Sequence, residues 1–295
     1  MTEGIRLARG CYLPVADPSF GDRCAALLLA NPIETVVVGT SAAALHGLWL
    51  PQLPAVPEFA TTQSGRKPAG MARARKPEIR THRRGIPRHE RTVVHGIPVT
   101  SLARTWWDLA AELTLPDLVA AGDRALQLGC AEEEIAGLVR SNSGRRGNVL
   151  ARQAAVMLDR RSRSRPESHL RVAVEVAGLD CFEVNEPIVG EFGEWLAEPD
   201  LSCTEAKIAL EYQGDEHARV GRMRKDITRL ADLRRGGWLV LLYGPAEVFG
   251  RPWQIGPELR QLVGQRAPHL LRRDRTAGAR EIASRVVDER MSGQW

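Results

Sequence analysis

Two carboxylates in the second half of the chain are placed where they could hold a divalent cation between them. Asp200 follows Pro199, and Glu211 lies in the apolar stretch Ile208–Tyr212, which predicts a short buried strand. Burying an acid in an apolar strand is costly unless the acid is paired or bound to a cation. Two neighbouring strands would bring Asp200 and Glu211 together, and a metal ion would then relieve the repulsion between them. We therefore expect a divalent cation at this place.

Most of the residues around this pair also have a purely structural interpretation. Asp200 fits an ordinary turn at the end of a strand. Glu167 stands three residues after Ser164, which is the spacing of a capping box at the start of a helix. His217 fits an exposed loop. The structural interpretation is weakest for Glu211, because apolar residues flank it on both sides in the predicted strand.

Local patterns predict the elements that must position these residues. The continuous apolar run 238–243 predicts a central strand covered on both faces. Apolar residues at helical spacing predict a helix over 100–111, with Thr100 or Ser101 as its cap and Trp106 in the core. Gly47 is expected to end an earlier short helix.

The segment from about 164 to 248 resembles the PD-(D/E)XK nuclease superfamily, and within it the very-short-patch-repair-type endonuclease domains. The matching pieces are Arg165-Pro166-Glu167, Pro199-Asp200, Glu211-Tyr212-Gln213-Gly214 with His217, the Arg- and Asp-rich stretch 224–235, and Gly237-Trp238-Leu239-Val240. The resemblance rests on the order and spacing of all five pieces together. It implies a restriction-endonuclease-like mixed sheet flanked by helices. It also implies a metal-dependent nuclease that uses Mg²⁺ or Mn²⁺ to hydrolyse phosphodiester bonds of DNA in repair or phage defence.

The resemblance also implies a role for each site residue. The implied catalytic residues are Glu167, Asp200, Glu211, Gln213 and His217, and the implied metal ligands are Asp200, Glu211 and the carbonyl of Tyr212. His217 would act as a general base or hold phosphate. Gln213 stands where the superfamily typically has Lys, so it would orient the attacking water without supplying charge. This departure keeps an alternative open, namely a non-catalytic DNA-binding or antitoxin-like transcriptional regulator with a decayed nuclease fold.

Clustered basic residues indicate a polyanionic partner. The formal charge is +5 and the pI is near 9.2, with Lys and Arg concentrated in 60–91 and 140–165. Such clusters suit phosphate contacts, and we expect DNA as the partner. The expected nucleic-acid contacts are Arg171, Arg222, Arg224, Lys225 and Arg229. Three of these fall on one face of a predicted helix, for which the alternative is a solvated surface paired to neighbouring acids.

The first half of the chain resembles AbiEi-type antitoxin proteins. The matching pieces are Arg9-Gly10-x-Tyr12, Ser41-Ala42-Ala43-Ala44-Leu45-His46-Gly47, and Gly96-Ile97-Pro98-Val99-Thr100-Ser101-Leu102-Ala103-Arg104-Thr105 with Asp108-Leu109. In that family a small winged-helix region precedes a β-rich segment and a helical one. The resemblance implies a smaller α+β domain with a winged-helix-like start, and a toxin or defence-system protein as a partner.

The length of 295 residues favours two domains. The Ser-, Gly- and Arg-rich stretch 141–147 is the clearest linker candidate. We expect an AbiEi antitoxin-like domain over 1–140, a linker and connecting helix over 141–163, a PD-(D/E)XK endonuclease-like domain over 164–265, and a basic tail over 266–295. The expected fold class is α/β in the second domain and α+β for the whole chain.

The composition argues against several other classes of protein. We find no run of about 18 apolar residues and no basic segment followed by an apolar one at the start, so we expect no membrane span, no signal peptide and a cytoplasmic location. The five cysteines are scattered and form no C-x-x-C pair. They therefore predict buried reduced thiols and give no support to a thiolate zinc site.

Overall fold

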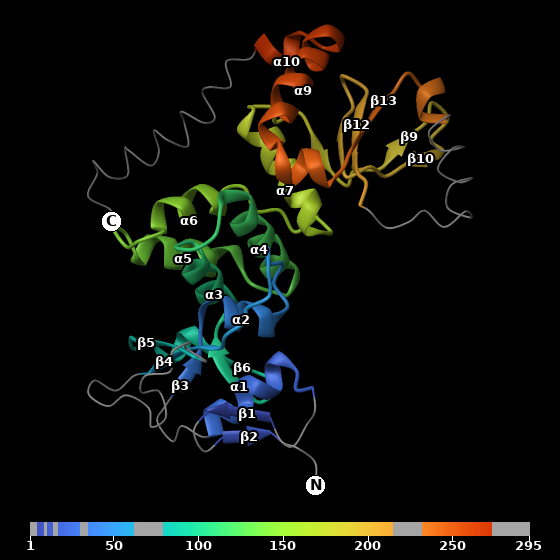
Figure 1. The fold of residues 1–295 in the computed structure, drawn as a ribbon. Helices are drawn as coiled ribbons and strands as arrows, with labels where there is room; N and C mark the ends of the chain where they lie inside the picture. The colour runs from blue at the N-terminus through green and yellow to red at the C-terminus, as the bar shows by residue number, and fades with distance from the viewer. Residues whose placement is uncertain are drawn as a thin grey trace. The chain divides into compact units, whose positions relative to one another are not determined.

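The computed structural model describes residues 5–8, 11–13, 17–29, 35–61, 79–214 and 232–272. The chain divides into two compact units, Met1–Val156 and Met157–Trp295. Both units are mixed α+β, with mixed sheets flanked by helices (Figure 1). None of the helices within these ranges is long and apolar enough to cross a membrane.

The first unit combines a mixed sheet with a group of helices. Its described elements are β1 (Ile5–Ala8), β2 (Cys11–Leu13), α1 (Phe20–Leu29), β3 (Thr35–Val37), α2 (Gly39–His46), β4 (Glu58–Thr61), β5 (Arg80–Arg83), the 3-10 helix η1 (Arg88–Glu90), β6 (Arg91–Val94), β7 (Ile97–Thr100), α3 (Leu102–Leu109), α4 (Leu115–Gln127), α5 (Glu132–Ser141) and α6 (Asn148–Ala155). β1 and β2 form an antiparallel pair, and the larger sheet has the order β5-β4-β3-β7-β6. β3 lies parallel to β7 and antiparallel to β4.

Short-range signals place the helices of this unit as predicted. Gly47, with φ 75°, ends α2. The side chain of Ser101 caps α3 by accepting a hydrogen bond from the Arg104 N–H at 3.3 Å. Trp106 is fully buried and donates from Nε1 to the Leu118 carbonyl of α4 at 2.9 Å. For α3 the cap and the apolar spacing were therefore enough to predict the helix. For α2 only the stop at Gly47 was predicted correctly, because the helix begins after Val38 without a side-chain cap, whereas Thr40 or Ser41 was expected to cap it.

The helix expected to connect the two domains belongs to the first unit. Trp107 Nε1 of α3 donates to Asn148 Oδ1 at 2.8 Å, and Asn148 Nδ2 donates to the Val139 carbonyl of α5 at 3.0 Å. These bonds fix the start of α6 against α3 and α5. The boundary between the units therefore falls after Val156, inside the segment predicted as a linker and connecting helix over 141–163.

The second unit is built around a four-stranded mixed sheet. Its described elements are α7 (Arg165–Val176), β8 (Glu183–Val184), β9 (Ile188–Val189), β10 (Trp195–Ala197), β11 (Leu201–Cys203), β12 (Ile208–Tyr212), β13 (Leu239–Tyr243), the π-helix η2 (Ala246–Gly250), α9 (Pro252–Arg266) and α10 (His269–Arg272). The strand order is β13-β12-β11-β8, and β11 is antiparallel to both of its neighbours while β12 and β13 are parallel. β9 and β10 form a separate antiparallel pair.

Apolar side chains cover both faces of this sheet. On one face Leu170 of α7 and Leu259 of α9 pack with Leu210 of β12. On the other face Ala209 of β12 packs with Ile188 of β9 and with other apolar residues. The alternation of Leu210 and Ala209 between the two clusters follows from the two-residue period of a strand.

The apolar run 238–243 was predicted to form a central strand, and this prediction is wrong for the described residues. β13 stands at the end of the strand order, next to β12 alone. Leu242 is 44% exposed, while Tyr243 is buried. A short apolar run indicates that most of a strand is buried. It does not distinguish a central strand from an edge strand that helices partly cover.

Candidate functional site

The structure brings Asp200 and Glu211 together at one end of the β11–β12 pair. Asp200 immediately precedes β11, Glu211 lies in β12, and the antiparallel register pairs the next residues inward, Leu201 and Leu210. Asp200 Oδ2 accepts a hydrogen bond from the Tyr212 backbone N–H at 2.7 Å. This bond holds the Asp200 carboxylate against the strand that carries Glu211.

Burial gives Asp200 an unusual charge state. Desolvation raises the pKa of Asp200 to about 7; the Tyr212 N–H opposes the rise, and the negative charges of Glu167 and Glu211 add to it. A substantial fraction of Asp200 is therefore protonated at neutral pH. A half-desolvated carboxylate beside other acids is also the electrostatic setting that a bound cation would stabilise.

Glu167 caps the helix α7, as its spacing from Ser164 predicts. The Ser164 hydroxyl accepts from the Glu167 N–H at 3.4 Å and donates to Glu167 Oε1 at 2.8 Å. Glu167 Oε2 accepts from the Arg163 N–H at 2.7 Å. The carboxylate of Glu167 is therefore held by the start of its own helix, while its charge still reaches Asp200.

Asn185 belongs to the same site, although the sequence analysis did not single it out. Its backbone N–H donates to the Asp200 carbonyl at 3.0 Å, and its side-chain amide donates to Glu167 Oε2 at 3.2 Å. Asn185 has a φ of 49°, in the left-handed region that Asn tolerates better than most residues. An Asn directly after a short strand was the only local signal for it.

The prediction that Arg171 contacts nucleic acid is contradicted by its position. Arg171 is 3% exposed. Its Nη1 donates to Glu175 Oε1 at 2.7 Å and to the Met157 carbonyl, and its Nε donates to Ser162 Oγ at 3.3 Å. The guanidinium therefore ties the segment before α7 to that helix and has no path to a phosphate backbone.

The other predicted site residues divide into two groups. Gln213 is exposed just after β12, where its backbone N–H donates to the Tyr243 carbonyl at 2.8 Å, and Tyr212 is half-buried. His217, Arg222, Arg224, Lys225 and Arg229 lie outside the described residues. The described part of the site is thus formed by the ends of β11 and β12 and the start of α7.

A further aromatic residue, Phe249 of η2, lies beside this site. The Arg165 guanidinium stands over its ring at 4.8 Å, and the His169 ring meets it edge-on at 4.9 Å. Tyr212 contacts the same ring from β12 at 6.3 Å. Phe249 therefore joins the first half of α7 to the end of β12.

The donor set for a cation is small. Among the residues that the structure describes, no three His, Cys, Asp or Glu side chains are arranged as a metal site. Asp200 and Glu211 are the carboxylates that could face a cation, because Glu167 is committed to the helix start. Such a sparse set suits Mg²⁺ and Mn²⁺ better than Zn²⁺, because Mg²⁺ keeps several of its waters.

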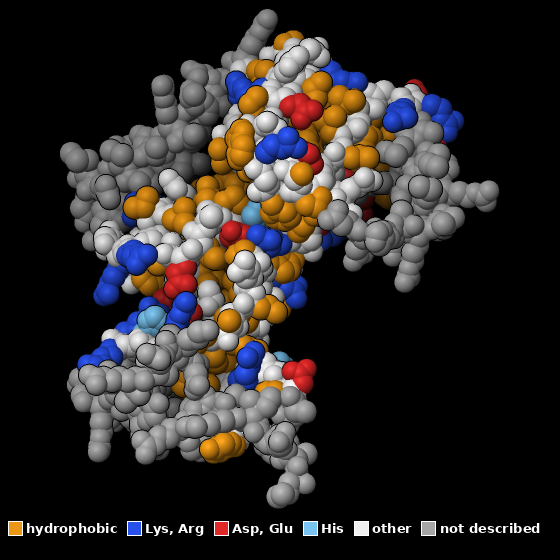
Figure 2. Space-filling view, viewed as in Figure 1, with side chains coloured by type: hydrophobic (Ala, Val, Ile, Leu, Met, Phe, Trp, Pro, Cys, Tyr) orange, Lys and Arg blue, Asp and Glu red, His pale blue; other side chains and the backbone are white. Residues whose placement is uncertain are grey.

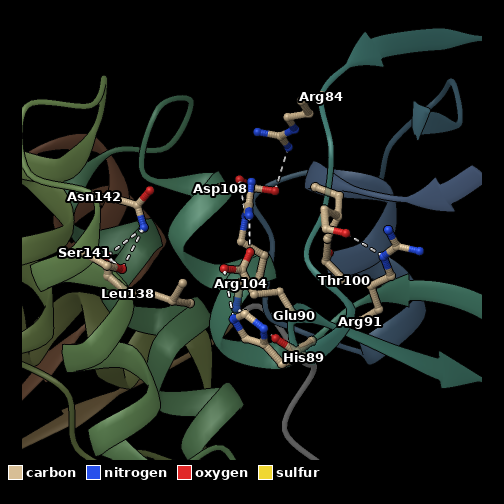
Figure 3. Close-up of polar contacts among 12 residues, drawn as sticks. Arg84, His89, Glu90, Arg91, Thr100, Arg104, Asp108, Leu138, Ser141 and Asn142 are labelled. Carbon is tan, nitrogen blue, oxygen red and sulfur yellow. Dashed lines mark hydrogen bonds and ion pairs between the residues drawn. The ribbon is translucent and has the colours of Figure 1, made fainter. Parts of the chain in front are cut away.

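The first unit contains a second concentration of charge, a buried ion network around α3 (Figure 3). Arg104 Nε donates to Asp108 Oδ1 at 3.0 Å, and Arg104 Nη1 donates to Glu90 of η1. Arg84 Nη2 donates to the other oxygen of Asp108 at 2.6 Å. The side chains of Arg104 and Asp108 are only 10% and 3% exposed, so this network is largely shielded from water.

The opposite charges of the ion network stabilise one another. Burial opposes the charge of Arg104, but Asp108 and Glu90 more than offset it and raise the pKa of Arg104 above its ordinary value. The guanidinium also lies over the Trp107 ring at 5.4 Å. Arg104 therefore joins η1 to α3, and Asp108 extends the network to Arg84 in the segment after β5.

A second buried acid, Glu58, forms an ion pair with Arg80 of the edge strand β5. Glu58 Oε1 accepts from Thr40 at 2.9 Å and from Arg80 at 3.3 Å, and Oε2 meets His82 Nε2 at 3.2 Å. Burial opposes the ionisation of Glu58, but His82 and Thr40 hold its pKa below the ordinary value. The charge of Arg80 is therefore matched within the protein.

A cavity of about 310 Å³ opens between η1 and α5 in the first unit. Its lining residues are His89, Glu90, Ser101, Ala103, Glu134, Gly137, Leu138 and Ser141. Both acids in it are already used, Glu90 by Arg104 and Glu134 by the Ala131 N–H at the start of α5, at 3.4 Å. Figure 3 shows Leu138 and Ser141 across from His89 and Glu90.

Comparison with known proteins places a family within the first unit. Residues 35–157 match the model of the AbiEi antitoxin C-terminal domain. The resemblance of the first half to AbiEi-type antitoxins is thereby confirmed for these residues. The match begins at β3 and ends at the boundary between the units.

Curated relatives cover only part of the chain. Two uncharacterized proteins of Mycobacterium tuberculosis, from strains CDC 1551 / Oshkosh and ATCC 25618 / H37Rv, are each 36% identical to it over 151 residues. These alignments cover 50% of this chain and 55% of each relative, so the chain spans about half the length of the curated relatives it matches. No solved structure matches the chain.

Proposed function

We propose that this protein is a DNA-binding, antitoxin-like regulator in which residues 35–157 act as an AbiEi-type domain. The observation that carries the proposal is the family match, which spans the five-stranded sheet and the helices α2 to α6. AbiEi antitoxins act with toxins of toxin–antitoxin systems, so the proposed protein partner is a toxin or another defence-system protein.

The arginines of the first unit support binding to DNA. Arg83, Arg88, Arg140 and Arg145 are exposed, and among the described residues they form no ion pair. Arg80 and Arg84, by contrast, are matched by Glu58 and Asp108. Unmatched guanidinium groups are suited to phosphate oxygens, and neutralising phosphates releases counterions from DNA. Figure 2 shows Lys and Arg side chains in separate groups on the visible face, which suits backbone contacts at several points.

Removing these four arginines should weaken binding to duplex DNA and make it less sensitive to salt. On B-DNA the log–log salt slope should fall by up to about 0.9 for each arginine that contacts a phosphate. The measurement is fluorescence anisotropy of a labelled duplex over a salt series, for the wild type and the variant Arg83→Ala/Arg88→Ala/Arg140→Ala/Arg145→Ala. Arg251→Ala is the matched control, because Arg251 is exposed but paired with Glu247 at 3.2 Å.

Two binding measurements test the proposed role as a DNA-binding regulator. A regulator should prefer a duplex from upstream of its own coding sequence to an unrelated duplex of equal length by at least about tenfold, since specific sites exceed non-specific binding by more than this. Equal affinity for both duplexes would argue against regulation through that DNA. An unchanged affinity and salt slope in the fourfold variant would remove the first unit from the DNA interface.

A metal-dependent nuclease in the second unit is a second candidate function, favoured by the pairing of Asp200 and Glu211. The arrangement of the unit supports it as well, since α7 precedes three antiparallel strands and β13 then adds in parallel. This order agrees with a core that holds an Asp and a Glu on adjacent strands, as the PD-(D/E)XK resemblance implies.

The site residues of the second unit would have different roles in such a nuclease. Asp200, Glu211 and the Tyr212 carbonyl would hold Mg²⁺ or Mn²⁺, which supplies Lewis-acid stabilisation of charge on the phosphate when bound. Gln213, exposed at the end of β12, would orient the attacking water. Asp200 must be ionised to bind the cation. Its raised pKa therefore predicts a cleavage activity that increases as the pH rises through about 7.

Glu211→Gln should lower metal-dependent cleavage of supercoiled plasmid by at least about 100-fold, since a lost carboxylate ligand removes several kcal/mol of charge stabilisation. The measurement is nicking and linearisation with Mg²⁺ and with Mn²⁺. The matched control is Glu183→Gln, an exposed carboxylate on β8 of the same sheet. A wild type that does not cut, or a Glu211→Gln protein that cuts at the wild-type rate, would exclude this site as a nuclease centre under those conditions.

A further inference from the structure

Two cysteines that are distant in sequence meet in the second unit. Cys203 lies in β11 and is 1% exposed, and Cys181 is half-buried in the loop that joins α7 to β8. Both side chains pack in the same apolar cluster, and Cys181 forms a side-chain hydrogen bond with Cys203. The antiparallel register of β11 and β8 pairs Ser202 with Glu183, so the backbone itself brings Cys203 beside the residues that directly precede β8, among which is Cys181. Disulfides need such close approach of the two backbone segments.

We propose that Cys181 and Cys203 are a redox-active thiol pair, which a peroxide converts into an intramolecular disulfide. This inference concerns the second unit alone and rests on neither proposed function. Both cysteines are free thiols in the structure. Disulfides in a reducing cell are usually transient and redox-sensing, and a pair that closes and reopens fits that use.

The chemistry of Cys203 differs from that of the other buried cysteines. The hydrogen bond from Cys181 lowers the pKa of Cys203 to about 7, against the effect of burial and with help from the Ala206 backbone N–H. Burial raises the pKa of Cys24 and of Cys130 to about 12. Because the thiolate is the reactive form, we expect Cys203 to be more reactive than Cys24 and Cys130.

The two thiols have complementary positions for a two-step oxidation. The Cys181 sulfur, which is the more exposed, attacks one oxygen of hydrogen peroxide; the O–O bond breaks, Cys181 becomes a sulfenic acid and one water leaves with the thiol proton. The Cys203 thiolate then attacks the sulfenic sulfur, the S–S bond forms and hydroxide leaves. This hydroxide takes up the proton that Cys203 released when it ionised, which gives a second water. Two thiols are oxidised and one peroxide is reduced to two waters.

The bond would also connect distant parts of the second unit. Cys203 pairs with Ile208 of β12, and the same strand β11 begins directly after Asp200. A disulfide would therefore tie the loop between α7 and β8 to the middle of the sheet. The expected consequence is restricted movement of this loop in the oxidised protein.

The test compares Cys24, Cys130, Cys181 and Cys203 within one native protein. The full-length chain is treated with a small molar excess of hydrogen peroxide at pH 7, alkylated, digested without reductant and mapped by mass spectrometry. We expect a linked peptide pair carrying Cys181 and Cys203, two hydrogens lighter than the reduced peptides, which dithiothreitol removes. In the untreated native protein, Cys181 or Cys203 should react with iodoacetamide at least about tenfold faster than Cys24 and Cys130.

Cysteine variants show whether Cys203 reacts because its thiolate is stabilised or only because it is accessible. Cys181→Ala should slow alkylation of Cys203 by at least about fivefold, because the donor that stabilises its thiolate is gone; Cys24→Ala should leave the pair unchanged. If Cys181→Ala does not fold, the disulfide mapping of the peroxide-treated wild type tests the proposal on its own. Absence of the Cys181–Cys203 link, or alkylation of Cys24 and Cys130 as fast as the pair, overturns the proposal.

Discussion

Replacing Arg104 by alanine should destabilise the first unit by about 3–5 kcal/mol, the usual cost of removing one partner from a buried ion pair. The loss is large because the carboxylates of Asp108 and Glu90 would stay in a largely desolvated place without their shared partner. The stacking of the guanidinium over Trp107 would be lost as well. Arg104→Lys should lose less, since it keeps the charge but not the fork that reaches two acids.

Urea unfolding followed by tryptophan fluorescence measures this effect, and native-state hydrogen exchange of the α3 amides assigns it to the first unit. Arg140→Ala is the matched control, because Arg140 is exposed on α5 and should change the unfolding free energy by less than about 0.5 kcal/mol. A loss below about 1 kcal/mol for Arg104→Ala would mean that water enters the network and screens it.

Replacing Asp200 by asparagine should stabilise the second unit at pH 8 by about 2–4 kcal/mol. An unfolded Asp titrates near 4, whereas burial raises the pKa of Asp200 to about 7 in the folded protein. A rise of this size corresponds to at most about 4 kcal/mol. Asparagine cannot ionise, yet its side-chain oxygen can still accept the hydrogen bond from the Tyr212 N–H.

The sign of the pH dependence follows from proton binding. Between about pH 4 and 7 the folded protein holds the Asp200 proton more tightly than the unfolded chain, so wild-type stability falls as the pH rises through this range and then levels off. Asp200→Asn should lack this fall, and the two proteins should converge near pH 4. Unfolding free energies at pH 5 and 8 test this, with Glu183→Gln as control. Parallel profiles would show that Asp200 titrates normally in the folded protein.

Added Mg²⁺ connects this prediction to the proposed nuclease. A cation that binds the folded site stabilises it by mass action, so Mg²⁺ should raise wild-type stability at pH 8 and narrow the difference from Asp200→Asn. The variant, with one ligand carboxylate removed, should respond less. An equal response of both proteins would place any bound Mg²⁺ elsewhere.

The sequence predicted best those features that depend on a few neighbouring residues. The caps Ser101 and Ser164 and the helix stop Gly47 follow from local hydrogen bonding and backbone preference, and all three are confirmed. The adjacency of Asp200 and Glu211 was also accessible, because two strands close in sequence usually pair with each other. The AbiEi resemblance is confirmed over 35–157, whereas the nuclease resemblance stays a prediction.

What the sequence did not reveal depends on contacts between distant segments. Arg171 looked like a basic helix residue facing phosphate, but the chain before α7 folds back and covers it. The ion network around Arg104 joins residues from η1, α3 and the segment after β5, so only the Arg104–Asp108 pair, one helical turn apart, had a local signature. β13 was misplaced because hydrophobicity does not encode the order of strands.

The bonds of Arg171 also determine how the second unit could be excised. A fragment beginning at residue 164, where the nuclease-like motif starts, would lack Met157 and Ser162, two of the acceptors of this buried guanidinium. Leaving buried donors without acceptors costs about 1–3 kcal/mol or more for a charged group. The autonomous piece should therefore begin at Met157 or earlier, so that motif boundaries and folding boundaries differ in this chain.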